Sequence, residues 1–513
     1  MITNIKQFYI ALVILLVSAT SCSLDEVPVS EPTPDAIYST ASGIEDGVNG
    51  VYAYLRDLYG SQRGFTLTTM GTDIFRHGKD GGYKSMDRYG TDFNASLSYV
   101  EDIWIACYEG INSANTVLDR IDLVEMEEEQ KNVFKAEVRF LRAHFYYWLT
   151  LQFGDVVLRE AETTGVITDD IRTDKNEIWQ FMKTDTEFAV ANLDWTNSDY
   201  GRITKGAALH QLSEIFLLLE DFEGAETTAK QLIEEGPYNL LNSYSQIFEY
   251  SNQENEEIIF AVQYINDPLN NGSGNQGHLF FTPAYDQFAG LTRDVTQGGR
   301  PYTRFRPTAF FRELFEENDT RFDVTFRYTW TYNNEETLPE GQAIGDTVIW
   351  ETEPGVFSFV APNEDQMHWG MKKHDDPTRA SFQDQAGFRD FFVYRLSETY
   401  LIAAEALLLQ NKNQEAAEYL NIVRARAAEP GTELPLITAA DIDMDVLLDE
   451  RALELGGEAS RWMDLARTGK LVERVAKYNE NAAPNIQSFH TLRPIPQSQI
   501  DLSTSDFPQN EGY

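Results

Sequence analysis

The chain has 513 residues, of which 42% are hydrophobic and 12% aromatic, so it can bury a large core and is not intrinsically disordered. It carries 82 acidic and 41 basic residues, which give a formal net charge of -41. A field of that sign repels phosphate backbones and anionic lipids. It argues against a nucleic-acid-binding protein and against one that rests flat on an anionic membrane.

The first 21 residues have the anatomy of an export signal. Lys6 is their single charged residue, an apolar run follows at 8–17, and small residues at 18–21 precede Cys22. The run is too short to span a bilayer of roughly 30 Å, which needs about 20 apolar residues. We therefore predict a signal peptide at 1–21. A Cys after small residues resembles the bacterial lipobox, so we expect Cys22 to be lipidated; ordinary cleavage beside an unmodified Cys22 is the alternative.

Residues 22–40 are predicted to form an extended tether, because they combine several prolines with acidic side chains. With Cys22 acylated, Cys107 has no partner for an intramolecular disulfide. Cys107 lies in a helical stretch, and we expect it to act as a small buried hydrophobic residue.

Residues 41–239 are predicted to be helical apart from one segment. Apolar residues recur at helical spacing at 44–55 and along 104–158. At 205–235 a Leu-rich helix, a short polar turn and a helix that begins with Ala follow one another. Residues 60–100 break this pattern, since they are rich in Gly, Asp, Tyr and Thr and have no apolar stripe. An irregular segment of this length is usually functional or disordered.

A second helix pair at 396–427 repeats the pattern of 205–235. It resembles the tetratricopeptide arrangement, in which each pair buries its apolar face by stacking on another. Because the two pairs are far apart in the chain, we predict that 240–390 is an inserted region of mixed loop and β structure. Residues 391–513 then form a C-terminal helical part and tail. The predicted fold class is mainly α, a helical repeat scaffold with a mixed loop/β insertion.

Two strands are predicted inside the insertion. The apolar run at 258–262 indicates a buried strand. Residues 324–332 alternate between apolar and polar side chains, which is typical of a half-buried strand, and 348–350 is a candidate partner.

Several motifs do not support a cofactor or a catalytic site. Residues 272–277 match G-x-G-x-x-G, but no parallel α/β pattern surrounds them, so we predict a loop. The acids at 441–445 lack the later residues of a calcium loop and favour an acidic helix N-terminus. His368 and His374 lie near two aspartates, yet this proximity is weak evidence, and we predict no metal and no cofactor. A glycosidase that uses a pair of carboxylates stays an alternative.

Five segments, in order, resemble the SusD/RagB family of outer-membrane nutrient-binding lipoproteins. They are Ala136–Leu158, Tyr394–Ala406, Leu420–Ala427, Leu448–Lys470, and the terminal Leu492–Pro496 with Pro508–Tyr513. One departure is the run Gly-Gly-Glu-Ala at 456–459, where the family usually has a Glu-Gly before an Arg-Trp pair. The resemblance implies a lipid-anchored, surface-exposed protein of the outer membrane. It would capture oligosaccharides without catalysis and pass them to a SusC-like TonB-dependent β-barrel transporter.

The resemblance also implies a ligand site, formed by loops from 70–95 and from 280–335. In this chain the two loops supply Asp73, Tyr83, Tyr89, Tyr285 and Trp330. Aromatic faces stack on the apolar face of a sugar ring, and carboxylates accept hydroxyl hydrogen bonds. Tyr83 and Tyr89 are expected to be exposed, because no apolar stripe accompanies them. Packing against the sheet is an equal alternative for Trp330, and Trp350 and Trp369 are the next candidates.

Two other functions stay open on the same fold. One is a peptide-binding, RagB-like uptake lipoprotein, and the other is a surface glycosidase. A sequence without a recognisable catalytic constellation favours binding over catalysis, but it does not distinguish a sugar from a peptide.

Overall fold

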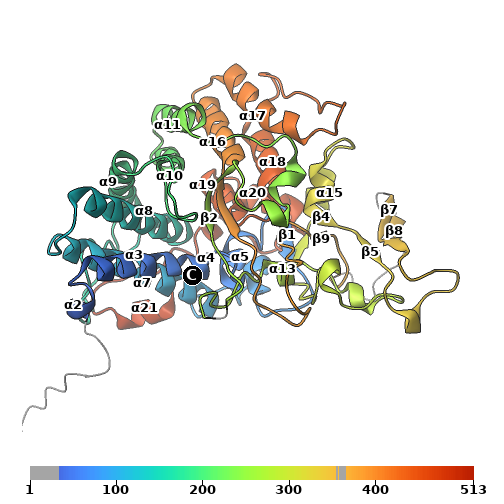
Figure 1. Ribbon diagram of the computed structural model, residues 1–513, viewed down its shortest axis with the longest axis horizontal. Helices are drawn as coiled ribbons and strands as arrows, with labels where there is room; N and C mark the ends of the chain where they lie inside the picture. The colour runs from blue at the N-terminus through green and yellow to red at the C-terminus, as the bar shows by residue number, and fades with distance from the viewer. Residues whose placement is uncertain (1–33, 268, 354–355, 358–364) are drawn as a thin grey trace, which may run out of the picture.

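The computed structural model describes residues 34–267, 269–353, 356–357 and 365–513. The predicted signal peptide, Cys22 and most of the predicted tether lie outside these residues; the end of the tether forms a short helix, α2 (Pro34–Ile37). Within the described ranges no helix combines the length and the apolar composition needed to cross a membrane. Helices dominate the ribbon in Figure 1, which confirms the mainly α fold class.

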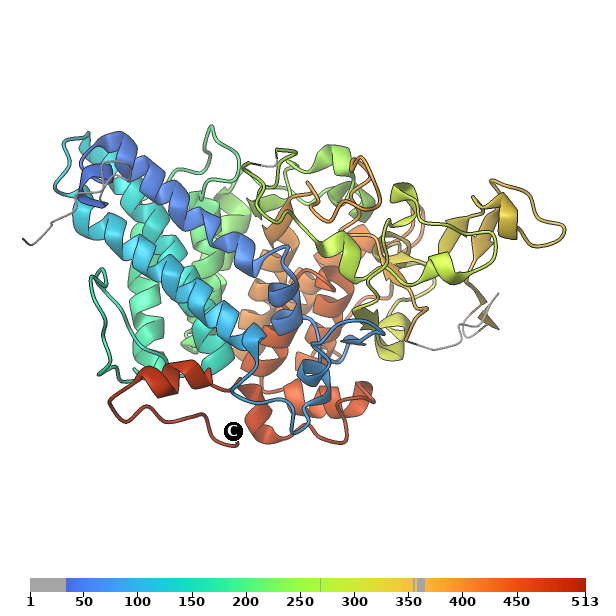
Figure 2. The ribbon, with the colours of Figure 1, turned by 90° about the horizontal axis from the view of Figure 1, so that it is seen from below.

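The helices form one stacked array. From α7 to α11 each long helix packs on the next one in the chain, and α3 lies against α7 and α8 (Figure 2). α11 then packs on α16, the first helix after the insertion, so the predicted pairs at 205–235 and 396–427 are neighbours in space. The bounds are α3 (Ala41–Ala53), α7 (Ser98–Ile121), α8 (Glu128–Phe153), α9 (Lys175–Asn192), α10 (Lys205–Leu218), α11 (Phe222–Glu235), α16 (Leu396–Leu409) and α17 (Asn413–Ala427).

Capping and small side chains explain why these helices begin where they do and approach so closely. The Thr204 and Asp221 side chains accept hydrogen bonds from the first turns of α10 and α11, at 3.4 and 3.0 Å. α11 and α16 meet through small buried residues, which allow two backbones to come close. These residues are Ala225, Ala229, Ala403 and Ala406. Cys107 on α7 is free and fully buried, as predicted.

The segment 60–100 is more ordered than the sequence suggested. It contains α5 (Gln62–Thr68) and α6 (Ser85–Arg88), after the short α4 (Leu55–Leu58). Residues 64–75 are buried throughout, because Phe65 and Leu67 pack into the main core. The stretches around 79–84 and 91–98 lie at the surface, whereas about half of the segment belongs to the core.

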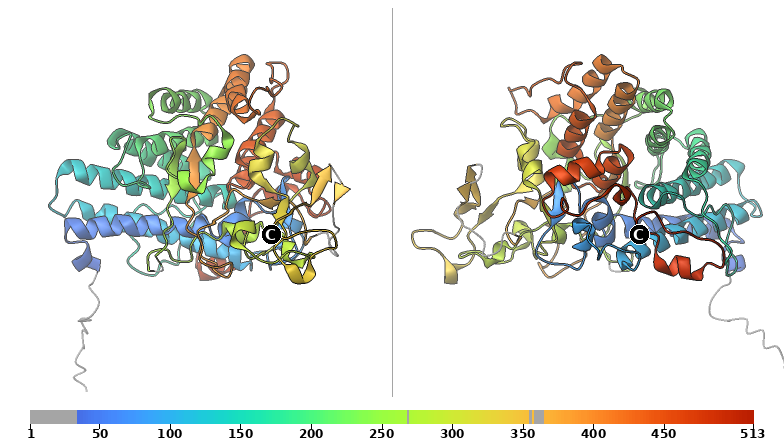
Figure 3. Two further views of the ribbon diagram at one scale, coloured as in Figure 1. Left: turned by 45° about the vertical axis from the view of Figure 1, so that its right-hand side comes forward. Right: turned by 180° about the vertical axis from the view of Figure 1, so that it is seen from behind.

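The insertion is built from short two-stranded sheets and extends away from the helices on one side of the molecule (Figure 3). β2 (Ile258–Val262), the predicted buried strand, pairs antiparallel with β10 (Phe391–Arg395) and closes the base of the insertion. Further out, β4 (Phe326–Arg327) pairs with β9 (Gly370–Met371), and β7 (Glu351–Glu353) with β8 (Val356–Phe357). β1 (Phe75–His77) pairs with β3 (Phe305–Pro307), which joins the segment 60–100 to the insertion.

The strand predicted at 324–332 is interrupted. Val324 belongs to the short helix α15 (Arg321–Thr325), and the extended part divides into β4 and β5 (Thr329–Thr331). β5 pairs with β6 (Thr347–Ile349), so the predicted partnership of 324–332 with 348–350 is confirmed. The other short helices of the insertion are α12 (Tyr244–Ile247), α13 (Gly277–Phe280) and α14 (Ala309–Glu313).

The C-terminal helices are broken where the sequence departs from the family pattern. Asp443 is the N-cap of α18 (Met444–Leu455), and its side chain accepts a hydrogen bond from Val446 N–H. This contact confirms the predicted acidic helix N-terminus. The chain then turns through 456–460, where Gly457 and Ala459 both have positive φ. α19 (Arg461–Arg467), α20 (Leu471–Tyr478) and α21 (Gln497–Leu502) follow.

A buried network of ion pairs ties the insertion to the C-terminal helices. The Arg395 guanidinium bonds Glu257, Glu454 and Glu458 at 2.9, 3.0 and 2.7 Å. Arg321, which is fully buried, bonds Glu454 at 3.4 Å. The remaining members are Asp319 and Glu450, which bond Arg321, Arg426, which bonds Glu257 and Glu454, and Lys373, which bonds Glu458.

Candidate ligand-binding surface

The structure brings together the two segments from which a ligand site was predicted. β1 and β3 align Arg76 with Arg306, and beyond them Gly78 N–H donates to Arg304 C=O at 2.8 Å. Asp80 N–H donates to Thr303 C=O at 3.4 Å. The surface stretch 79–84 therefore lies beside residues 300–304 of the insertion.

Asp73 is a structural residue in this fold. Its side chain is fully buried, and its carboxylate bonds Arg461 at 2.6 Å and Arg474 at 2.7 Å. Burial alone would raise the pKa of Asp73, but the two guanidinium groups hold it below its usual value. Its carboxylate is thus occupied inside the protein and does not face a ligand.

The expected exposure of Tyr89 is wrong, since its side chain is 2% exposed. Its hydroxyl donates to Gly71 C=O at 2.7 Å and accepts from Trp462 Nε1 at 3.2 Å. The ring packs against Phe93 and His490, so both the aromatic ring and the hydroxyl group have partners inside the protein. Burial raises the pKa of Tyr89 to about 12.

Tyr285 and Trp330 form the small core of the insertion. Their rings stack with centroids 5.9 Å apart, and both side chains are almost fully buried. The Tyr285 hydroxyl donates to Gly299 C=O at 2.7 Å. Trp330 therefore faces the inner side of its strand, the alternative that its apolar neighbours indicated. Trp350 is also buried, whereas Trp369 is partly exposed and donates to Glu351 at 2.7 Å.

Tyr83 is half-buried, and it belongs to a group of side chains that we call the tyrosine–arginine cluster: Tyr83, Tyr99, Tyr302 and Arg304. The Tyr83 and Tyr99 rings are in contact, with centroids 3.6 Å apart. The Arg304 guanidinium carbon lies 4.4 Å from the centroid of the Tyr302 ring, and that of Arg300 lies 5.3 Å from it. The side chains of Tyr83, Tyr302 and Tyr99 all lie near enough to the Arg304 guanidinium to influence its pKa.

The backbone beneath this cluster is unusual. Thr303, between Tyr302 and Arg304, has φ of 47°, which is an outlier for a β-branched residue. Strain of this kind is kept where the surrounding structure fixes it, and it is concentrated at functional sites. On the facing segment, a Cβ at Gly82 would lie 3.0 Å from the Tyr99 hydroxyl. A side chain at position 82 would therefore crowd that hydroxyl group.

The cations of the cluster have no anionic partner among the described residues. Neither Arg304 nor Arg300 forms an ion pair or side-chain hydrogen bond there, and Arg304 Nε is buried without a partner. Burial lowers the pKa of Arg304. The negative charge of Asp80 acts in the opposite direction, but its carboxylate lies beyond ion-pair distance. The cluster therefore offers flat aromatic faces beside unused N–H donors, which suits a polar ligand with ring-shaped apolar faces.

Sequence reasoning named two segments that are adjacent in the structure, but it did not name Tyr99, Tyr302 or Arg304. Tyr99 lies at the start of α7, where an aromatic residue usually packs in the core. The run Arg-Pro-Tyr-Thr-Arg at 300–304 was the available signal, because it places two cations around one aromatic residue without any acid.

A separate groove begins further along α7, the helix that starts beside Tyr99. It has a volume of about 390 Å³ between α7, residues 157–170 and α21. Its rim exposes Ile105, Ile167 and Leu502. Arg159 and Asp170, its paired charges, satisfy each other. The groove is mainly apolar, and it lacks the unused donors that the tyrosine–arginine cluster provides.

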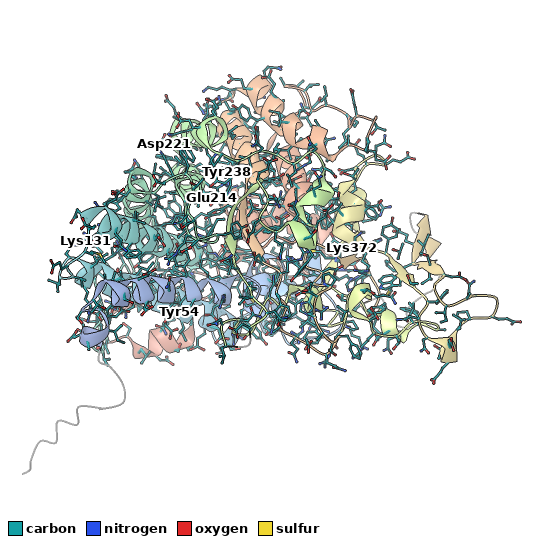
Figure 4. The ribbon with its side chains drawn as sticks, in the orientation of Figure 1. Tyr54, Lys131, Glu214, Asp221, Tyr238 and Lys372 are labelled. Atoms are coloured by element: carbon teal, nitrogen blue, oxygen red, sulfur yellow. The ribbon has the colours of Figure 1, made fainter. Side chains whose placement is uncertain are left out.

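One group in the described part of the chain has metal-type ligands close together: His210, Glu214 and Glu398, whose ligand atoms lie within 4.8 Å of one another. Glu214, labelled in Figure 4, and His210 lie on α10, inside the scaffold. Arg451 already neutralises Glu398 at 2.7 Å, and burial raises the pKa of Glu214 to about 7. We regard the group as part of the scaffold core.

The histidines considered as metal ligands from the sequence are structural in this fold. The His374 ring bonds Gly457 C=O at 2.9 Å, and the His368 ring bonds Trp369 C=O at 2.9 Å. Burial lowers the pKa of both rings, to about 4 and about 3, so they are neutral at physiological pH.

Comparison with protein families matches both halves of the chain. A family model described as the SusD family matches residues 256–513, and one described as starch-binding, associating with outer membrane, matches residues 24–217. A SusD-like protein of Formosa agariphila is 26% identical over 97% of each chain. The starch-binding protein SusD of Bacteroides thetaiotaomicron is 24% identical over 82% of this chain and 80% of its own.

Solved structures share the fold. A laminarin-binding SusD-like protein superposes with a TM-score of 0.74 at 22% identity, over 93% of this chain and all of that one. Surface glycan-binding protein A of Bacteroides thetaiotaomicron, in complex with laminarihexaose, superposes with a TM-score of 0.71 at 21% identity, over 92% of this chain and 99% of that one.

Proposed function

The chain belongs to the SusD family, and on this premise we propose that it is a non-catalytic lipoprotein of the outer-membrane surface that captures oligosaccharides. The tyrosine–arginine cluster carries this proposal. It combines half-buried aromatic rings from two distant segments with unused hydrogen-bond donors. Relatives whose names record laminarin, starch or glycan binding support the ligand class.

The cluster has the chemistry that sugar binding requires. A pyranose ring has an apolar face of C–H groups, which packs on Tyr83 or Tyr302, and an equatorial rim of hydroxyl groups. Arg304 donates to such oxygens, and the tyrosine hydroxyl groups both donate and accept. A binding site of this type gains specificity from a few polar groups placed around an apolar platform.

Calorimetry with laminarihexaose and a panel of other oligosaccharides tests the site. Binding to the best ligand should weaken about tenfold or more in Tyr83→Ala and in Tyr302→Ala, because each variant removes one stacking face. Tyr400→Ala is the matched control, since Tyr400 is a partly exposed tyrosine on α16, remote from the cluster. Equal affinity in both cluster variants would move the site elsewhere, first to Trp369 and then to the groove beside α21.

The same panel separates the alternative functions. A peptide array run beside it would favour the RagB-like alternative if peptides bind and oligosaccharides do not. Incubation of the protein with each bound oligosaccharide, followed by mass analysis, should return the oligosaccharide uncut. Shorter products would contradict the proposal that the protein is not an enzyme.

We also propose that Cys22 carries the lipid anchor and that the helical array faces a TonB-dependent β-barrel transporter. Acylation holds a protein to the membrane by roughly 0.8 kcal/mol per buried CH₂. Cys22→Ser should therefore release soluble protein, and intact-mass analysis of extracted protein with an unmodified Cys22 would contradict the anchor. Purification from native membranes should recover a β-barrel, and its absence would argue against the transporter.

A further inference from the structure

Four cations lie on the two segments that form the tyrosine–arginine cluster. Arg300 and Arg304 flank Tyr302, while Lys79 and Lys84 flank the facing stretch that carries Tyr83. None of the four side chains forms an ion pair with a described residue. This is notable in a chain with twice as many acids as bases.

The neighbouring arginines show that acids are available nearby. Arg76 and Arg306, which face each other across β1 and β3, pair with Glu480 and with Asp365 respectively. Arg63, close to Tyr83, pairs with Asp102 at 2.6 Å. The cations beside the tyrosines therefore differ from these three neighbouring arginines, each of which has an anionic partner.

Neither of the two carboxylates nearest in this region, Asp80 and Asp102, forms an ion pair with the Arg304 guanidinium. Asp80 is exposed and acts on Arg304 only beyond ion-pair distance, and Asp102 is engaged by Arg63. The guanidinium group beside the Tyr302 ring buries its Nε, and its two terminal NH2 groups form no ion pair or side-chain hydrogen bond with a described residue. A planar fork of this kind matches the paired oxygens of a carboxylate or a sulfate.

We propose that the oligosaccharide bound at this surface is acidic and carries uronate carboxylates or sulfate esters. This inference rests on the proposed function and names its ligand class. Tyr83 and Tyr302 would hold sugar rings, and Arg304, with Arg300, would bind an anionic group of an adjacent sugar. The excess of negative charge on the chain would repel the same ligand, so recognition depends on the basic side chains at this surface.

The test is calorimetry with three probes of similar length: laminarihexaose, which is neutral, an oligogalacturonate, which carries carboxylates, and a carrageenan oligosaccharide, which carries sulfates. One or both acidic probes should bind more tightly than laminarihexaose, and their affinity should fall as salt rises. Arg304→Met should weaken the acidic probe about tenfold or more, since a hydrogen bond to a charged group is lost. Arg304→Lys should recover part of the loss.

Lys205→Met is the matched control. Lys205 also lies over an aromatic ring, that of Trp195 at 5.2 Å, but on the helical array. Its removal should leave the affinity for the acidic probe unchanged, and an equal loss in this control would mean that net charge alone attracts the ligand. The two acidic probes distinguish carboxylate from sulfate recognition.

Failure of this inference differs from failure of the proposed function. Binding of laminarihexaose with no binding of either acidic probe would overturn the inference and leave oligosaccharide capture in place. Unchanged affinity for an acidic probe in Arg304→Met would also overturn it. Absence of binding to all three probes, together with binding of an acidic peptide, would overturn both.

Discussion

Two arginine-rich regions of the molecule differ in whether their arginines have anionic partners among the described residues. In the buried network Arg395 is surrounded by three carboxylates. Arg321 is also surrounded by three, of which it shares Glu454 with Arg395. In the tyrosine–arginine cluster Arg304 has no carboxylate within ion-pair distance among the described residues, although it is half-buried. The same residue type thus holds the fold together in one region and is left available in the other.

The difference follows from solvation. A charge that is removed from water completely needs compensating charges and hydrogen bonds, because its desolvation costs several kcal/mol. A half-exposed arginine keeps enough water to remain charged without them. The absence of an anionic partner costs least at the surface, and there it leaves a charge that a ligand can use.

The largest expected effect comes from breaking the buried network. Arg395→Met leaves Glu257, Glu454 and Glu458 buried with fewer partners, and it should lower the free energy of unfolding by about 3–5 kcal/mol. Urea denaturation measures this change. Arg395→Lys keeps the charge but not the several hydrogen bonds, so it should cost less and remain folded if the Met variant does not. A loss below about 1 kcal/mol in both variants would contradict the importance of the network.

A smaller loss is expected at the residue that sequence analysis had placed in the ligand site. Asp73→Asn removes the carboxylate that Arg461 and Arg474 share, and it should cost about 2–3 kcal/mol of stability. The folded variant should bind oligosaccharide as the wild type does, since Asp73 is fully buried. Loss of affinity without loss of stability would return Asp73 to the ligand site.

Asp73 also shows what a sequence can and cannot predict. Residues 205–235 and 396–427 were recognised as helix pairs, and 258–262 as a strand, because their apolar periodicity is local. The partners of Asp73 lie about 390 residues further along the chain. No local pattern indicates such a pairing, so the carboxylate looked available for a ligand.

The candidate site was predicted at the level of segments but not of side chains. Tyr89 has no apolar stripe around it, yet its ring fills a space between distant residues, and Trp330 occupies an alternating strand whose inner face could not be identified from the sequence. Tyr302 and Arg304 become recognisable once β1 and β3 place them beside Tyr83. Spatial proximity, rather than residue type, marked the cluster.

A pH-dependent effect of intermediate size is expected inside the helical array. Burial raises the pKa of Glu214 to about 7, above the roughly 4.3 of an unfolded chain. The contribution of this carboxyl group to stability is complete below about pH 4, and it is lost as the pH rises through 7, because the unfolded chain then releases a proton that the folded protein retains.

Glu214→Gln removes this titration. Relative to wild type, the variant should gain about 3 kcal/mol between pH 4.5 and pH 8, as measured by urea denaturation across that range. Tyr147 donates to Glu214 at 3.0 Å, and a glutamine oxygen can still accept that hydrogen bond. Parallel stability curves for the two proteins would show that Glu214 has no raised pKa.

The smallest expected effect on stability lies in the tyrosine–arginine cluster. Arg304→Met removes a half-buried charge that has no ion pair to lose, so the free energy of unfolding without ligand should stay within about 0.5 kcal/mol of wild type. Because burial lowers the pKa of Arg304, a small gain is the favoured direction. Thermal unfolding of Arg304→Met beside Arg395→Met measures both regions under one set of conditions. A loss above about 2 kcal/mol in Arg304→Met would show that this arginine, too, holds the fold together, and the contrast between the two regions would disappear.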